Sequence, residues 1–395
     1  MCAGVTVLFL FSSFVPNHRG SKLASLGVLK VVLDAGHGGT DPGNLGTGRY
    51  KHTEKDIALE VVKRVGNYIE RSFENVDVIY TRKEDKFVTL KDRTAIANKA
   101  QADLFISVHC NSAANKQAHG TETFVMSMTK VAANLELAKR ENSVILLEEN
   151  YEQTYEGFDP KEPESLIARS IAQSVYLDQS LTLSAHIQEQ YRDRVSRRDR
   201  GVKQAPYWVI SFTTMPSVLT ELGFLTNAEE EDFLNSENGK AYMSSAIYRA
   251  FKQYKAEIEG VEINTFHSDA DLPPIEETQE KEAPKPEVAV EEKSDEVVVP
   301  PTAEPVIYKI QLMASASPIE LKPENFKGLD DVKKYEVNGL HKYTVGEVTD
   351  YKKAVSLQRT VREKAYPKAF IIAFYKGERI SISKALEISK ALQTN

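Results

Sequence analysis

Apolar runs that alternate with helical stretches between residues 29 and 255 most constrain the fold of this 395-residue chain. The runs LKVVLDAG (29–36) and ADLFISVHCNSA (102–113) are typical of buried strands. Between them, EKDIALEVVKRVGNYIERSF (54–73) repeats apolar residues at the helical spacing. Strands that alternate with helices predict an α/β domain, in which a mostly parallel mixed sheet has helices on both faces.

Residues 128–200 interrupt this alternation. They form a long, charged stretch with a helical pattern, and no strand is needed there. We therefore expect a helical insertion within the sheet domain, which as a whole is predicted to span residues 29–256. The length of the chain also indicates two or three domains rather than one.

Two further regions follow the sheet domain. Residues 257–305 are acidic and proline-rich with almost no apolar periodicity, so they predict an extended linker. Residues 306–392 contain three apolar runs, and a helical stretch (352–366) separates the last two. They predict a small α+β domain, which at roughly ninety residues is large enough to fold alone.

The N-terminal residues 1–22 begin with the apolar run MCAGVTVLFLFSSFV. This run is shorter than the roughly 20 residues that a spanning helix needs, and it is typical of a signal-peptide core. The basic residues that normally precede such a core are missing. We expect a signal peptide here and hence an exported protein, with a membrane-proximal anchor or a core strand as the alternatives.

Composition excludes several kinds of site. The net charge of −7 argues against nucleic acid as a partner, because nucleic-acid binding requires a basic face. The only cysteines are Cys2 and Cys110, so neither a disulfide framework nor a cysteine-based zinc site can be built. A strand position favours a buried structural role for Cys110. We expect His52 and His119 to lie at the surface.

Two of the predicted strands end on a histidine, His37 in LDAGHGG and His109 in FISVHCNSA. Neighbouring parallel strands end at the same edge of a sheet, so the two imidazoles are expected to converge there. Glu54 opens the predicted helix that follows the first strand. It has a structural interpretation as well, since Thr53 is a good N-cap, Asp56 completes a capping box, and a first-turn glutamate suits the helix dipole.

Two histidines and one carboxylate form a ligand set of catalytic zinc, which keeps a fourth position open for water. The sequence thus predicts one Zn²⁺ in the sheet domain. Glu221 ends a short apolar run in PSVLTELGFLTN (216–227), where an unpaired carboxylate is costly to bury. It is therefore either an ion-paired core residue or a functional one that takes a proton from water and passes it to a leaving amine.

Four segments in this order resemble the zinc-dependent N-acetylmuramoyl-L-alanine amidases of bacterial cell walls. They are LDAGHGGTDPG (33–43), TEKDIAL (53–59), SVHCNSA (107–113) and MPSVLTELGFLTN (215–227). The resemblance implies an α/β fold with about six strands. It also implies hydrolysis of peptidoglycan at the amide that joins the lactyl group of N-acetylmuramic acid to the first L-alanine of the stem peptide.

Carried over residue by residue, the resemblance makes His37, Glu54 and His109 the zinc ligands and Glu221 the catalytic glutamate. The protein would then work in the bacterial periplasm or cell envelope, in wall remodelling and daughter-cell separation. An Arg-rich stretch, YRDRVSRRDR (191–200), is either a solvated helix end or a contact for stem-peptide carboxylates.

The predicted insertion contains LELAKRENSVILLEENYE (135–152), which resembles the inhibitory helix of the division amidases. The resemblance implies that Glu141 occupies the open position of the metal, which would displace the water and cover the groove. Glu148 and Glu149 are weaker candidates, and a surface helix with ordinary acidic residues is the alternative. Such an inhibited state implies an activator protein that relieves it.

The C-terminal domain resembles the SPOR family of peptidoglycan-binding domains. YKIQLMASAS matches the first strand of that family, HKYTVGEVTDYKKAVSLQRTV its middle strand and helix, and AFIIAFYKGERI its last strand. The resemblance implies binding to glycan strands without stem peptides, which are what an amidase leaves behind. A tethered domain of this kind would raise the local concentration of the enzyme on partly processed wall.

Two other functions remain open at this point. A zinc peptidase that cleaves the stem peptide itself would need the same metal-activated water, so the ligand set does not separate it from an amidase. A wall-binding regulator without catalysis would use both domains for anchoring. The intact ligand set together with Glu221 speaks against that second alternative.

Overall fold

The computed structural model describes residues 28–126, 132–148, 150–155, 158–162, 176–259, 261, 304–315, 317–337, 340–366, 369–380 and 382–394. The predicted signal peptide (1–22) and almost all of the predicted linker (257–305) lie outside these residues, so both stay predictions. Within the described part of the chain, no helix is both long and apolar enough to cross a membrane.

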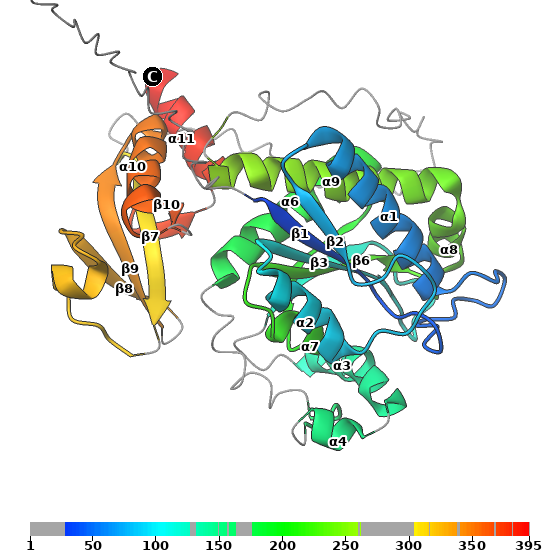
Figure 1. Cartoon of the computed structure of the whole chain (residues 1–395). Helices are drawn as coiled ribbons and strands as arrows, with labels where there is room; N and C mark the ends of the chain where they lie inside the picture. The colour runs from blue at the N-terminus through cyan, green and yellow to red at the C-terminus, as the bar shows by residue number, and fades with distance from the viewer. Residues whose placement is uncertain are drawn as a thin grey trace, which may run out of the picture.

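A six-stranded sheet with the order β2-β1-β3-β6-β4-β5 forms the larger body of the molecule (Figure 1). Its strands are β1 (Lys30–Ala35), β2 (Asp77–Tyr80), β3 (Leu104–Asn111), β4 (Thr121–Met126), β5 (Asp199–Ala205) and β6 (Ser217–Phe224). The first three strands and β6 are parallel, whereas β4 is antiparallel to β6 and parallel to β5. This arrangement confirms the predicted mostly parallel mixed sheet.

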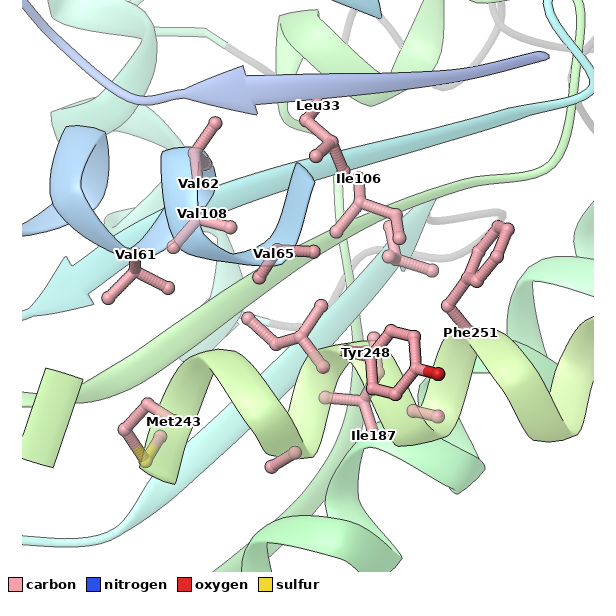
Figure 2. Close-up of a cluster of buried hydrophobic side chains, with 14 of the residues drawn as sticks. Leu33, Val61, Val62, Val65, Ile106, Val108, Ile187, Met243, Tyr248 and Phe251 are labelled. Atoms are coloured by element: carbon pink, nitrogen blue, oxygen red, sulfur yellow. The ribbon is translucent and has the colours of Figure 1, made fainter. Parts of the chain in front are cut away.

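Helices cover both faces of this sheet, as predicted. They are α1 (Glu54–Ser72), α2 (Leu90–Ala100), α3 (Ala132–Asn142), α6 (Leu177–Val195), α7 (Trp208–Ser211), α8 (Ala228–Asn235) and α9 (Glu237–Glu259). On one face, Leu33 and Ile106 of the sheet join a core with α1, α6 and α9; Figure 2 shows them beside Val65 of α1 and Phe251 of α9. On the other face, Val32 packs with α2, α3 and α7, because successive strand residues point to opposite sides.

The structure departs from the predicted helical insertion (128–200) at its C-terminal end. Helix α6 is part of the sheet domain, since Leu183, Ile187 and Tyr191 are fully buried in its core. Strand β5 begins at Asp199, inside the stretch where no strand was expected. Its sequence DRGVKQA has one buried residue and no apolar alternation, so the strand has no recognisable pattern at the sheet edge.

The remaining described part of the insertion is helical. After α3 come η1 (Ser143–Leu147) and the short α4 (Tyr151–Thr154). Ile145, Tyr155 and Phe158 pack in a small buried cluster around Trp208 of α7. This cluster anchors the insertion beside the carboxyl edge of the sheet.

The C-terminal domain is a five-stranded antiparallel sheet with the order β11-β10-β7-β9-β8 (Figure 1). Its elements are β7 (Ile307–Ser315), η4 (Pro323–Phe326), β8 (Val332–Val337), β9 (Leu340–Val348), α10 (Tyr351–Lys364), β10 (Phe370–Tyr375), β11 (Glu378–Ile380) and α11 (Ile382–Thr394). Three of these strands and α10 correspond to the predicted runs, whereas β8, β11 and α11 were not predicted. The domain is α+β, as expected.

Candidate active site

The glycines around His37 allow a close approach of two histidines. Strand β1 ends at Ala35, and His37 itself adopts a left-handed backbone with φ of 60°. A Cβ atom on Gly36 would lie 2.4 Å from the ring of His109, so only glycine leaves room for that imidazole. The same holds at Gly43, where a Cβ atom would lie 2.7 Å from the ring of His37. The glycines therefore leave room for the two imidazoles beside the ends of β1 and β3, which are neighbours in the sheet.

Two buried arginines hold the turn that carries His37. Arg93 donates to Oδ1 of Asp34 at 2.7 Å and to the carbonyl oxygen of His37 at 2.6 Å, while Arg82 donates to that of Gly36 at 2.7 Å. Burial alone would raise the pKa of Asp34, but the charge of Arg93 and two hydroxyl donors hold it below its usual range. The ion pair and the carbonyl contacts make this turn a rigid platform.

Glu54 lies between the two imidazoles, at the first position of α1. Its Oε1 atom is 3.0 Å from Nε2 of His37 and 3.1 Å from Nδ1 of His109. The backbone N–H groups of Cys110 and Asn44 donate to its two oxygens at 2.8 Å each. The structure thus brings together the three residues that the sequence predicts as metal ligands.

The structural interpretation of Glu54 also holds. Helix α1 begins at this residue, and the N–H group of Thr53 donates to the side chain of Asp56 at 2.9 Å, as in a capping box. A helix that starts beside the strand ends therefore satisfies its own first turn and presents a carboxylate to the site.

Glu141 of α3 is the fourth member of the cluster. Its Oε2 atom is 3.4 Å from Nε2 of His37 and 3.3 Å from Nδ1 of His109, and Arg140 donates to its other oxygen at 2.9 Å. Burial alone would raise the pKa of Glu141, but Arg140 and the two histidines hold it well below its usual range. The other candidate, Glu148, instead accepts a hydrogen bond from Tyr155, and Glu149 lies outside the described residues.

The spacing of these four groups fits a zinc ion. One ligand atom from each of His37, Glu54, His109 and Glu141 lies within 4.8 Å of all the others. Four atoms at ~2.0–2.1 Å around a tetrahedral zinc lie about 3.3 Å apart, and the contacts given above are 3.0–3.4 Å. Asp41 accepts from Nδ1 of His37 at 2.7 Å, which leaves the lone pair of Nε2 directed toward the cluster.

The electrostatics of the cluster favour a cation. Burial alone would lower the pKa of His109, but the carboxylates of Glu141 and Glu54 raise it to about 9. The pKa of His37 is likewise raised well above its usual range, against the effect of burial, chiefly by Glu54. The two carboxylates thus stabilise positive charge between the imidazoles, as a metal site requires.

Glu221 is directly beside the cluster. It lies on β6 opposite His109 in the register of the parallel pair, and its side chain is 1% exposed. Neither carboxylate oxygen has a hydrogen-bond partner among the residues that the structure describes. Burial, with the charge of Glu141 next in importance, raises its pKa to about 8. Glu221 is therefore not the ion-paired core residue that was the structural alternative.

A second buried carboxylate, Glu122 on β4, pairs with Glu221 across the antiparallel strands. Unlike Glu221 it is fully partnered: Arg200 and Lys203 of β5 donate to Oε1 at 2.5 and 2.6 Å, and Asn111 donates to Oε2 at 2.9 Å. Sequence reasoning missed Glu122, since TETFVM follows β3 closely and has no apolar alternation that marks a separate strand.

The space beside the cluster is small. A cavity of about 20 Å³ is lined by residues that include His37, His109, Glu141 and Tyr207. Such a volume holds about one water molecule. Glu141 thus forms part of the wall of the cavity beside the two histidines.

A larger hollow of about 820 Å³ lies beside the loops that follow β3 and β6. Lys116, His119, Arg197 and Arg198 contribute to its lining. The Arg-rich stretch thus includes side chains at a hollow, and Arg197 is also ion-paired with Glu230. Both interpretations of this stretch stay open.

The residues expected to have no chemical role lie as predicted. Cys110 is 1% exposed within the core of the sheet, and no disulfide forms among the described residues. His52 and His119 are exposed. His119 contacts the carbonyl oxygen of Gln117 through Nδ1 at 2.9 Å.

The fold and the site define an α/β domain with a His/Glu cluster at the carboxyl edge of its sheet. Residues 31–253 match the Amidase_3 family, described as N-acetylmuramoyl-L-alanine amidase. Because the match covers more than half of the chain, the protein belongs to this family.

The chain is also similar to individual bacterial proteins. N-acetylmuramoyl-L-alanine amidase AmiA of Escherichia coli strain K12 is 32% identical over 229 residues, which cover 57% of this chain and 75% of AmiA. The uncharacterized protein YqiI of Bacillus subtilis strain 168 is 34% identical over 224 residues, or 57% of this chain and 84% of YqiI. Among solved structures, an N-acetylmuramoyl-L-alanine amidase from Clostridium difficile 630 is 25% identical, with a TM-score of 0.44 and coverage of 58% of this chain and 97% of that chain.

Proposed function

We propose that the protein is a zinc-dependent amidase of bacterial peptidoglycan. It cleaves the amide between N-acetylmuramic acid and the L-alanine of the stem peptide, as its family membership supports. The observation that carries the zinc chemistry is the cluster of His37, Glu54 and His109, whose ligand atoms have the separation that a tetrahedral zinc requires.

In this proposal, His37, Glu54 and His109 hold one Zn²⁺. The ion would supply a water of lowered pKa and polarise the substrate carbonyl. The surrounding residues keep the ligands in place: Asp41 fixes the tautomer of His37, and the N–H groups that donate to Glu54 orient its carboxylate. Arg82 and Arg93 hold the His37 turn through hydrogen bonds to its backbone carbonyl oxygens.

Glu221 is the proposed general base and acid. It accepts a proton from the attacking water and passes it to the amine of L-alanine as the C–N bond breaks. A carboxylate suits this task when its pKa is near neutrality and its oxygens are not occupied by hydrogen bonds to other residues. The buried side chain of Glu221 meets both conditions.

We also propose that Glu141 inhibits the enzyme from within. Its contacts with both histidines support a carboxylate that occupies the position of water, with α3 over the groove. Activity then requires withdrawal of α3, and an activator protein is the expected cause. Such control suits a wall hydrolase of cell separation, exported by the predicted N-terminal signal to the periplasm.

The test of the reaction is digestion of a soluble muropeptide that carries an intact stem peptide. We expect mass spectrometry to find a free stem peptide with an L-alanine amino terminus and a disaccharide with a free lactyl carboxylate. Cleavage within the stem peptide would instead support a peptidase. If a zinc-loaded chain without α3 binds the muropeptide but does not cleave it, the protein is a binding protein. Either of these two results would contradict the proposal.

A further inference from the structure

The phenol hydroxyl of Tyr207 is buried without a hydrogen-bond partner. Tyr207 lies between β5 and α7, and its side chain is 1% exposed. Among the residues that the structure describes, none forms a hydrogen bond with its hydroxyl. A buried polar group without a partner destabilises the folded state, so native proteins contain few of them and each calls for an explanation. Stability gives no reason for this hydroxyl, so we looked for a functional one.

Tyr207 lies beside the cluster of the candidate active site. It lines the cavity of about 20 Å³ together with His37, His109 and Glu141. The Oε2 atom of Glu141 is 3.4 Å from Nε2 of His37 and 3.3 Å from Nδ1 of His109. In the proposed inhibition, this oxygen occupies the position that a reacting oxygen takes once α3 withdraws. Tyr207 is therefore next to the place where the scissile carbonyl would bind.

Tyr207 also lies on the same face of the sheet as the proposed general base. Its ring packs edge to face against Phe124 of β4, with centroids 5.2 Å apart, in one cluster with Leu219 of β6. Glu221 follows Leu219 by two positions on β6, so both side chains point to this face. Burial raises the pKa of Tyr207 well above its usual range, and the negative charge of Glu221 raises it further. The hydroxyl thus stays protonated and is close enough to Glu221 to interact with its charge.

The sheet domain itself holds Tyr207 in place. The backbone N–H group of Ser211 donates to the carbonyl oxygen of Tyr207 at 3.1 Å, in the single turn of α7. Helix α3 contacts the neighbours of Tyr207 instead: Asn142 donates to the carbonyl oxygen of Pro206 at 3.1 Å and accepts from the N–H group of Trp208 at 2.8 Å. Withdrawal of α3 would therefore uncover this segment, while the ring keeps its packing against β4 and β6.

Amide hydrolysis places negative charge on the carbonyl oxygen. As the oxygen of water adds to the lactyl carbonyl carbon, the π electrons of the C=O bond move onto the carbonyl oxygen and Glu221 takes the proton of water. When the C=O bond re-forms, the C–N bond breaks and Glu221 passes that proton to the amine. A hydrogen-bond donor already placed beside the carbonyl oxygen stabilises its charge without reorganisation during the reaction.

We propose that Tyr207 is a further catalytic residue, whose hydroxyl donates a hydrogen bond to the carbonyl oxygen of the scissile amide as that oxygen becomes negatively charged. This inference rests on the proposed amidase reaction. Tyr207 keeps its proton throughout, whereas Glu221 transfers the proton of water. Since the hydroxyl has no other partner, it breaks no bond to form this one, and its buried surroundings strengthen the interaction.

The test is Tyr207→Phe in the full-length chain, measured in the wild type and in Glu141→Ala. Phenylalanine keeps the ring and removes only the hydroxyl. We expect kcat on a soluble muropeptide to fall about 10²–10³-fold, the effect of removing one oxyanion donor. The KM should stay within a few-fold, and the variant should retain one zinc ion per chain. The Tm should stay the same or rise, because the hydroxyl has no partner to lose.

Tyr191→Phe is the matched control. Tyr191 is equally buried, but its hydroxyl is hydrogen-bonded to that of Thr220 at 3.2 Å. Thr220 directly precedes Glu221 on β6 and therefore points to the opposite face of the sheet. Loss of this hydrogen bond should lower the Tm and leave kcat within a few-fold of the parent chain.

Binding of a transition-state analogue separates an oxyanion donor from a structural residue. The probe is a muropeptide in which a phosphinate replaces the scissile amide, because its charged tetrahedral oxygens resemble the reacting carbonyl. By calorimetry, we expect zinc-loaded Tyr207→Phe in the Glu141→Ala chain to bind this probe about 10²-fold more weakly than its parent, whereas Tyr191→Phe binds it as the parent does.

Three results would overturn the proposal. They are an unchanged kcat in Tyr207→Phe, a lower kcat with an unchanged Kd for the phosphinate, and a lower Tm accompanied by loss of zinc, which would indicate a structural role. If the parent Glu141→Ala chain itself does not cleave the muropeptide, the amidase reaction is contradicted and this inference with it. That failure is distinct, because it appears before any change at Tyr207.

Discussion

Glu221→Gln is expected to lower the rate of amide hydrolysis about 10²–10⁴-fold, the range that general acid–base catalysis contributes. Glutamine is nearly isosteric but cannot accept the proton of water. Since Glu221 is not among the predicted metal ligands, the variant should still bind one zinc ion per chain. The measurement combines the initial rate on a soluble muropeptide with the zinc content after dialysis.

Glu122→Gln is the matched control for this variant. Glu122 is equally buried and pairs with Glu221 across β4 and β6, but Arg200 and Lys203 hold its charge. We expect the control to be less stable than the wild type, because Arg200 and Lys203 lose their anionic partner. Its hydrolysis rate should stay within a few-fold of the wild-type rate. A Glu221→Gln enzyme with full activity, or one that loses zinc as well, would refute the assigned role.

Glu141→Ala is expected to raise the basal rate of the full-length enzyme by about 5- to 150-fold, the span of typical coupling between a regulatory and an active site. The carboxylate contacts both histidines of the cluster, so its removal opens that position to water. The rate should be measured on a soluble muropeptide with zinc in slight excess. Glu141→Gln keeps the size of the side chain, so it is the second variant to test if alanine weakens the packing of α3.

Glu136→Ala is the control for Glu141→Ala. It lies on the same helix, its side chain is 73% exposed, and its ion pair is with Lys139. Its rate should equal that of the wild type. If the rates of both Glu141 variants also equal that of the wild type while their zinc content is unchanged, Glu141 does not restrain the enzyme.

The proximity of His37, Glu54 and His109 could be predicted because each residue lies at the end of an element that the sequence indicates. His37 and His109 each end an apolar strand, and parallel strands bring such ends to one edge. Glu54 opens the next helix, so its position near that edge follows from the same topology. The prediction that Glu141 reaches the cluster depended on the resemblance alone, because nothing in the residue spacing of α3 indicates that this carboxylate points toward the histidines.

The features that were missed are those without a local pattern. Strands β4 and β5 are antiparallel to the rest of the domain and mostly lack apolar alternation, so their pairing is decided by the whole sheet. The position of Glu122 beside Glu221 follows only from that strand pairing. The contact of Asp178 with Lys342 joins residues 164 positions apart, for which sequence periodicity has no signal.

Zinc titration into the metal-free protein tests the central claim most directly. Glu141→Ala is the suitable background, because hydrolysis can then be followed whether or not α3 restrains the wild type. We predict that hydrolysis of the muramoyl–alanine amide is absent without metal, rises with added zinc and reaches its plateau at one equivalent per chain. The same titration of a chain that also carries His109→Ala should show neither tight zinc binding nor hydrolysis. Full hydrolysis in the metal-free protein, or unchanged zinc binding after His109→Ala, would contradict the account.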